Sequence, residues 1–190
     1  FRSCTITTIT FPANINVIES QAFAGTNLTG LLTLPNTISS LGDGAFLNCT
    51  FISAISFSKN NLFTSIPIDC FQNCRGLTSL DLPLQITSIG DTAFAGCTNI
   101  VGSLVIPKNV TSLGSSCFLS CAGFSSCYIQ TYSPPTVSVS NPAFLNTSFT
   151  TVNIPFNASP TWPSVYDDNK MVVIAEQPTC APFSYFYYNN

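Results

Sequence analysis

A nine-residue stretch ending in Phe-x-x-Cys recurs along this 190-residue chain at a nearly constant interval. It reads LGDGAFLNC at residues 41–49, IGDTAFAGC at residues 89–97 and LGSSCFLSC at residues 113–121. Self-alignment extends the series to one Phe per copy: Phe23, Phe46, Phe71, Phe94, Phe118 and Phe144. The gaps between these Phe are 23, 25, 23, 24 and 26 residues, a period typical of solenoids. We therefore expect stacked coils that bury a continuous core, because one coil cannot bury its apolar face alone.

Each copy predicts the same local structure. An aliphatic residue stands five positions before the Phe: Ile18, Leu41, Ile66, Ile89, Leu113 and Val139. In five of six copies the residue three before the Phe is a preferred helix N-cap: Ser20, Asp43, Asp91, Ser115 and Asn141. We therefore expect one helical turn at the corner of each coil. Short alternating segments such as Leu32-Thr33-Leu34-Pro35 follow the corners, and their period of two predicts strands that the Pro ends.

The unit L-x-I-P-x-x-V-x-x-I-G-x-x-A-F-x-x-C-x-x-L resembles the BspA-type leucine-rich repeat, and residues 82–106 follow it almost throughout. The resemblance covers residues 6–155 and departs from the pattern at Pro67, at a Ser/Pro-containing insertion (133–135) and at Thr147. It implies a leucine-rich-repeat solenoid of about six coils over residues 1–155. It also implies a secreted or cell-surface protein that adheres to other proteins and has no catalytic activity. Residues 156–190 lie outside the pattern and are interpreted as a C-terminal cap with an aromatic tail.

Composition narrows the function independently of the repeat. Only 7% of residues are charged and the net charge is −3, with no Lys/Arg cluster, which argues against nucleic-acid binding. There is no His, so a Ser or Cys nucleophile would lack its usual base. We predict no enzyme activity, no cofactor and no metal. No apolar run reaches the length of a membrane span.

The nine Cys fall into two groups. Cys49, Cys74, Cys97 and Cys121 each follow the repeat Phe by three positions, which predicts a buried ladder of small core residues, although ladder disulfides remain geometrically open. The disulfide candidates are the Cys that break this rule: Cys70, Cys117, Cys127 and Cys180. Many Cys in a chain without His are typical of secreted proteins, so we expect an extracellular or cell-surface location.

Two kinds of surface site are predicted. Asn-x-Ser/Thr triplets make Asn27, Asn48, Asn109 and Asn146 candidate N-glycosylation sites, although composition alone accounts for their number, and Pro160 weakens a fifth at Asn157. The outward positions of the predicted strands form a candidate binding face: Thr33, Ser56, Asp81, Val105, Tyr128 and Asn153. This face is mostly small and polar, so a merely solvated surface is the competing interpretation.

The chain ends in an uncharged aromatic tail, APFSYFYYNN. Its aromatic residues either cover the last coil or mediate self-association: Phe183, Tyr185, Phe186, Tyr187 and Tyr188. A weakly charged solenoid is suited to head-to-tail assembly. Two functions therefore remain open, namely structural self-assembly as a surface-coat or filament subunit, and adhesion by a monomeric module that binds a host or matrix protein through its sheet face.

Overall fold

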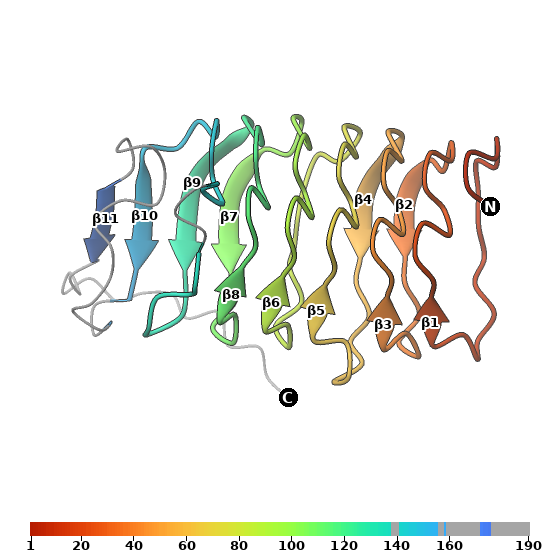
Figure 1. The fold of residues 1–190 in the computed structure, drawn as a ribbon, viewed down its shortest axis with the longest axis horizontal. Helices are drawn as coiled ribbons and strands as arrows, with labels where there is room; N and C mark the ends of the chain where they lie inside the picture. The colour runs from red at the N-terminus through yellow and green to blue at the C-terminus, as the bar shows by residue number, and fades with distance from the viewer. Residues whose placement is uncertain (138–140, 156–157, 159–171, 176–190) are drawn as a thin grey trace.

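The chain forms an elongated solenoid whose coils stack along one axis (Figure 1). The computed structural model describes residues 1–137, 141–155, 158 and 172–175. Longer strands line one side of the stack, and two-residue strands line the other (Figure 1). The longer strands are β2 (Gly30–Thr33), β4 (Ile52–Ser56), β7 (Gly102–Ile106), β9 (Phe124–Ile129), β10 (Thr151–Ile154) and β11 (Val172–Ala175). The short ones are β1 (Val17–Ile18), β3 (Ser40–Leu41), β5 (Ser65–Ile66), β6 (Ser88–Ile89) and β8 (Ser112–Leu113).

All strand pairs among the described residues are parallel, as a solenoid requires. The residues that face inward pair with their counterparts one coil away, for example Ile66 with Ile89 and Ile89 with Leu113. In the interior coils the same residues are almost completely buried. The predicted leucine-rich-repeat solenoid of about six coils is therefore confirmed.

The core is a column of Phe rings. Consecutive repeat Phe from Phe23 to Phe144 have ring centroids 5.4–5.8 Å apart and interplanar angles of 1–16°. Stacked pairs of this kind contribute about 0.5–1.5 kcal/mol each beyond their area burial. From Phe46 to Phe144 every ring in the column is fully buried. The constant spacing of the Phe in the sequence thus becomes one continuous core.

A further corner, missed by the sequence analysis, lies at the start of the column. Phe1 stacks on Phe23 with centroids 5.5 Å apart, and the Cys4 N–H donates to Phe1 O at 3.0 Å. Ser3 has a φ of 57°, like the residue two after the Phe in the other corners. Phe1-Arg2-Ser3-Cys4 therefore has the conformation of a repeat corner, although Phe1 is 71% exposed.

The corners are not helical, and the predicted helical turn is wrong. At Phe71 a left-handed residue stands two positions before the ring (Asp69, φ 54°) and another two after it (Asn73, φ 58°). The Phe71 N–H donates to Ala93 O in the next coil (2.8 Å), whereas the Gln72 N–H donates back to Asp69 O (3.1 Å). A helix needs an unbroken run of right-handed residues. No helix occurs in the described part of the chain.

The polar residues predicted as helix N-caps link neighbouring coils instead. Ser20 Oγ donates to Asp43 O at 2.8 Å, and Asp91 Oδ1 accepts from the Ser115 N–H at 2.7 Å. Each bond joins a corner to the corner of the next coil. The polar residue types that the sequence places here are therefore explained by stacking rather than by helix capping.

The long-strand side is divided into two sheets, β2-β4 and β7-β9-β10-β11. The segments 9–11 and 80–82, predicted as strands, have no strand assignment. The loop that follows β4 is two residues longer than the loop that follows β2. Eight positions separate Ile55 in β4 from the buried residue Phe63, whereas six separate Leu32 in β2 from the equivalent residue Ile38. The Gln85 side chain of the following coil donates to Ser58 O in this wider loop (2.8 Å). A side-chain hydrogen bond thus links the two coils beside the break in the ladder.

Candidate functional site

The positions predicted to form a binding face do not lie in one continuous row. Thr33 pairs with Ser56 across β2 and β4, and Tyr128 pairs with both Val105 and Asn153 across β7, β9 and β10. Asp81 is exposed but lies in the segment without strand assignment. The structure therefore brings Val105, Tyr128 and Asn153 together and separates them from Thr33 and Ser56.

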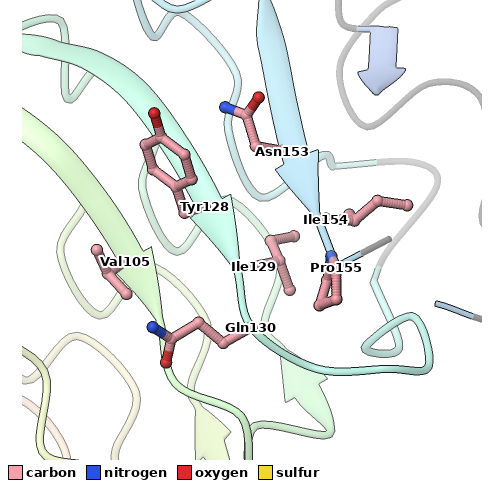
Figure 2. A pocket seen from close by; sticks show the side chains of 7 residues that line it. All are labelled: Val105, Tyr128, Ile129, Gln130, Asn153, Ile154 and Pro155. Atoms are coloured by element: carbon pink, nitrogen blue, oxygen red, sulfur yellow. The ribbon is translucent and has the colours of Figure 1, made fainter. Parts of the chain in front are cut away.

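A shallow hollow of about 270 Å³ lies over β7, β9 and β10 (Figure 2). Its outward side chains are Val105, Tyr128, Gln130, Asn153 and Pro155, and the buried strand residues Ile129 and Ile154 also line it. Tyr128 and Val105 are each 38% exposed, which is high for large apolar or aromatic side chains on a strand. The hollow therefore combines an aromatic ring and aliphatic groups with two side-chain amides, and its described lining residues include no carboxylate, Lys or Arg.

Asn153 is fixed in orientation by one hydrogen bond. Its Nδ2 donates to the carbonyl oxygen of Cys127 on the neighbouring strand at 3.0 Å. This bond uses one of the two N–H groups of Nδ2, and Oδ1 keeps its capacity to accept a hydrogen bond. Figure 2 shows the amide beside Tyr128, with its nitrogen on the side of the ring and its oxygen on the far side. The hollow thus places an oriented side-chain amide next to an aromatic ring.

The hollow lies where the chain departs from its own repeat. Gln130 stands where Pro35, Pro83, Pro107 and Pro155 end the equivalent segments of other coils. Having a peptide N–H, Gln130 donates to Ile106 O (3.0 Å) and continues the main-chain pairing beyond β9. Tyr128 is also the only aromatic residue among the predicted face positions. Sequence analysis missed Gln130 and Pro155, and the absent Pro was the signal that could have identified Gln130.

A second, smaller hollow of about 150 Å³ lies over residues 7–9 and β2. Leu31, 62% exposed, is its most prominent apolar side chain, and Thr33 also lines it. This hollow lacks an aromatic ring and a side-chain amide. It offers fewer specific contacts than the hollow at Tyr128.

The Cys ladder is a set of buried free thiols. Each Sγ donates to the Phe carbonyl of the preceding coil, at 3.0 Å for Cys49, 3.2 Å for Cys74, 3.2 Å for Cys97 and 3.1 Å for Cys121. Thr26 and Thr147 hold the equivalent positions nearer the two ends, and each donates from Oγ1 to the Phe carbonyl of its own corner at 2.8 Å. The ladder residues are therefore core residues, as predicted, with an added hydrogen-bonding role.

Three of the four disulfide candidates are also free and buried, namely Cys70, Cys117 and Cys127. Burial raises the pKa of the Cys70, Cys117 and Cys127 thiols, because a thiolate loses its hydration in the core. The same effect raises the pKa of Cys121 to about 12. Cys4 is exposed. The fourth candidate, Cys180, lies outside the described residues.

The candidate glycosylation sites Asn27, Asn48, Asn109 and Asn146 are all exposed. Asn48 and Asn146 adopt left-handed conformations two positions after a repeat Phe. The Asn48 side chain accepts from Asn73 Nδ2 (3.0 Å), and Asn109 Nδ2 donates to Leu84 O (3.0 Å). These two amides therefore already hold neighbouring coils together.

The remaining predicted positions fall outside the described residues. They are Asn157 and the proposed self-association residues Phe183, Tyr185, Phe186, Tyr187 and Tyr188. Within the described ranges, no three His, Cys, Asp or Glu side chains gather as a metal ion would require. The same ranges contain no helix of the length and hydropathy needed to cross a membrane.

Solved structures of three leucine-rich-repeat proteins resemble this solenoid. A leucine-rich cell surface protein from Faecalibacterium prausnitzii has 31% identity and a TM-score of 0.60, with 72% of this chain and 34% of that chain covered. A leucine-rich repeat protein from T. pallidum has 21% identity and a TM-score of 0.57, with 75% of this chain and 70% of that chain covered. A leucine-rich repeat protein from Bacteroides ovatus has 19% identity and a TM-score of 0.52, with 89% of this chain and 49% of that chain covered. The latter two support the fold alone, and the match spans about a third of the Faecalibacterium protein.

No curated protein matches the sequence. The family profile named BspA type leucine rich repeat region (6 copies) matches residues 1–125 and residues 60–171. The two matches together reach from residue 1 to residue 171, and the repeat Phe, the corner Gly and the ladder Cys described above all lie within them. The chain belongs to the BspA-type leucine-rich-repeat family.

Proposed function

We propose that this chain is a non-catalytic protein-binding module of a cell-surface protein, and that it binds its partner through the exposed face of β7, β9 and β10. The single observation that carries the proposal is the hollow around Tyr128, the one aromatic residue among the predicted face positions. Aromatic side chains in such positions dominate the energetics of protein interfaces. The cell-surface location is supported by the printed description of the Faecalibacterium relative.

The scaffold suits this role because it holds the face rigidly. Val105, Tyr128 and Asn153 come from three successive strands in fixed parallel register. Val105 and Tyr128 are followed by Ile106 and Ile129, which are buried in the core and so fix the strand orientation. Little conformational entropy is then lost when a partner binds.

The test is binding of the purified chain to a panel of purified matrix and host-surface proteins, measured by biolayer interferometry. Tyr128→Ala should weaken binding to any partner found by at least about tenfold, the cost of one interface hot spot. Thr33→Ala on β2 is the matched control on the other sheet and should leave affinity unchanged. Equal affinities for wild type and Tyr128→Ala would contradict the proposed face.

Self-assembly as a coat or filament subunit is a second candidate, supported by the low charge of the chain (7%), which provides little like-charge repulsion between copies. Light scattering over a dilution series, with negative-stain microscopy, separates the two functions. A monomer at every concentration would eliminate the filament. Ordered fibres that still form with Tyr128→Ala would instead eliminate the sheet face as the assembly surface.

A further inference from the structure

We infer that the hollow at Tyr128 accepts a single uncharged aromatic side chain with a hydrogen-bond donor, Tyr or Trp, from the partner protein. The inference rests on the proposed function and specifies the chemistry of that partner. Three properties of the hollow lead to it: its size, its lack of charge and the fixed amide of Asn153.

Size restricts the occupant first. The hollow measures about 270 Å³, just below the lower end of the range of about 300–1,000 Å³ typical of pockets that enclose a small-molecule ligand. It is also partly open to solvent rather than fully enclosed. A site of this size and depth fits one side chain projecting from a larger surface, with the rest of the partner lying over the flat sheet on either side.

The lack of charge in the described lining restricts the occupant further. Among the described residues the lining consists of Val105, Tyr128, Gln130, Asn153 and Pro155 with two Ile, so this part of the lining offers no ionised side chain to a carboxylate, an ammonium or a guanidinium. A charged side chain buried against this surface would lose hydration without compensation. The Tyr128 ring, Val105 and Pro155 instead offer apolar contact area, which an aromatic ring uses most fully.

The amide of Asn153 then selects among aromatic rings. Its Nδ2 donates to Cys127 O at 3.0 Å, which fixes the amide and leaves Oδ1 able to accept a hydrogen bond. The Tyr hydroxyl and the Trp indole N–H are donors, whereas Phe has none. A Phe in the hollow would cover Oδ1 without satisfying it. The site should therefore discriminate Tyr and Trp from Phe.

The test uses N-acetyl amides of single amino acids as probes and backbone amide chemical shifts of the full chain as the readout. N-acetyl-tyrosinamide and N-acetyl-tryptophanamide should shift the amides of Tyr128, Gln130 and Asn153. N-acetyl-phenylalaninamide should bind about 3- to 10-fold more weakly, the worth of one neutral hydrogen bond. N-acetyl-lysinamide should not bind. Affinities should not change between about 50 and about 500 mM NaCl, because no charge is involved.

Two variants separate the parts of the argument. Asn153→Leu keeps the volume and removes the acceptor, so the preference for Tyr over Phe should disappear while Phe binding is retained. Tyr128→Ala should abolish binding of all three aromatic probes, and Thr33→Ala should change nothing. The same spectra report folding, because amides far from the hollow must keep their chemical shifts. If Asn153→Leu disturbs them, Asn153→Ala, which also removes the acceptor, replaces it.

Equal binding of the Tyr and Phe probes to the wild type, or shifts confined to another surface, would overturn the inference. The proposed function has a separate readout in the partner-protein assay. If the probes fail while partner binding still depends on Tyr128, this inference is wrong and the binding face stands. If partner binding does not depend on Tyr128, the proposed face is wrong whatever the probes do.

Discussion

Each interior ring in the Phe column contacts a ring above and a ring below, whereas an end ring has one such neighbour, so the contribution of a ring depends on its place in the stack. Phe94 is fully buried and stacks on Phe71 and Phe118, at 5.5 Å from each. Phe1 belongs to the same column but is 71% exposed and stacks on Phe23 alone. Phe residues at equivalent repeat positions therefore contribute differently to the free energy of unfolding.

Phe94→Ala should lower the free energy of unfolding by about 3–5 kcal/mol, because it leaves a cavity and removes two ring contacts. Phe1→Ala, the matched control, should cost less than about 1 kcal/mol. Urea denaturation followed by circular dichroism measures both. Similar losses for the two variants would contradict a core centred on the interior rings.

The buried thiols should react very slowly with alkylating reagents at neutral pH. With a pKa of about 12, Cys121 has about one thiolate in ten thousand at pH 8. Brief treatment of the native protein with iodoacetamide should therefore modify Cys4 and leave Cys70, Cys97 and Cys121 unmodified, as read by peptide mass spectrometry. Labelling of the ladder at the rate of Cys4 would show that the coils open readily.

The same thiols make stability depend on alkaline pH. Folding raises the pKa of Cys121 above the value of 9.0 for a free thiol, so its stabilising effect is complete below about pH 9 and is lost as the pH rises towards 12. The free energy of unfolding should fall in this range by up to about 1.4 kcal/mol per pH unit for each such thiol. The difference between the urea midpoints at pH 8 and pH 10 measures this loss of stability. The loss should be smaller in Cys121→Ala than in the wild type. An equal loss in the two proteins would mean that groups other than Cys121 cause it.

At the scale of the element, the corner is where sequence reasoning succeeded and failed. Its position, its buried Phe and its polar residues could all be predicted from the repeat. Its conformation was missed, because Ser and Asp are favoured both at helix N-caps and in turns. A usable signal existed two residues after the Phe, where Gly25, Asn48, Asn73 and Asn146 tolerate the left-handed region better than other residues.

The candidate site was predicted in the same partial way. The period of two correctly placed Val105, Tyr128 and Asn153 on one face, because alternation fixes which side chains point outward. The break at 80–82 depends on how two loops of unequal length pack, and this does not follow from a local pattern. The hollow depends on Gln130, which continues the alternation after Tyr128 in place of the Pro of other coils, and that missing Pro is a local signal.

One glycine of the corner is required by close packing between coils. A Cβ on Gly114 would lie 2.4 Å from the backbone nitrogen of Asp91, whereas a Cβ on Gly102 would meet nothing within 4 Å. Gly114→Ala should therefore cost about 2–4 kcal/mol by forcing neighbouring coils apart. Gly102→Ala, where only the φ of 89° opposes a side chain, should cost about 1 kcal/mol. Thermal unfolding of the two variants measures both losses of stability. Equal losses would contradict a requirement for Gly114 in the packing between coils.

At the scale of the whole molecule, each coil contacts only its neighbours, so coils should be removable as units. Deleting residues 24–46 joins Phe23 to Leu47 and removes one period of 23 residues. The shortened chain should fold, with the hollow at Tyr128 intact and a urea m-value reduced by roughly one sixth. Deleting residues 24–35 removes half a coil and should prevent folding, because inward positions would then face outward. A shortened chain that fails to fold in both cases would contradict the independence of the coils.

The direction of the corner hydrogen bonds has a mechanical consequence. At each junction from Phe23 to Phe144 the bonds made by the Phe N–H run from one coil to the next, along the stacking axis. Tension applied between the two ends would load these junctions in series rather than share the force among them. The weakest junction should yield first and release one coil, about 80 Å of extended chain for about 23 residues. If the two ends are then held at a fixed separation, the released length lowers the tension on every remaining coil, including those that form the Tyr128 hollow.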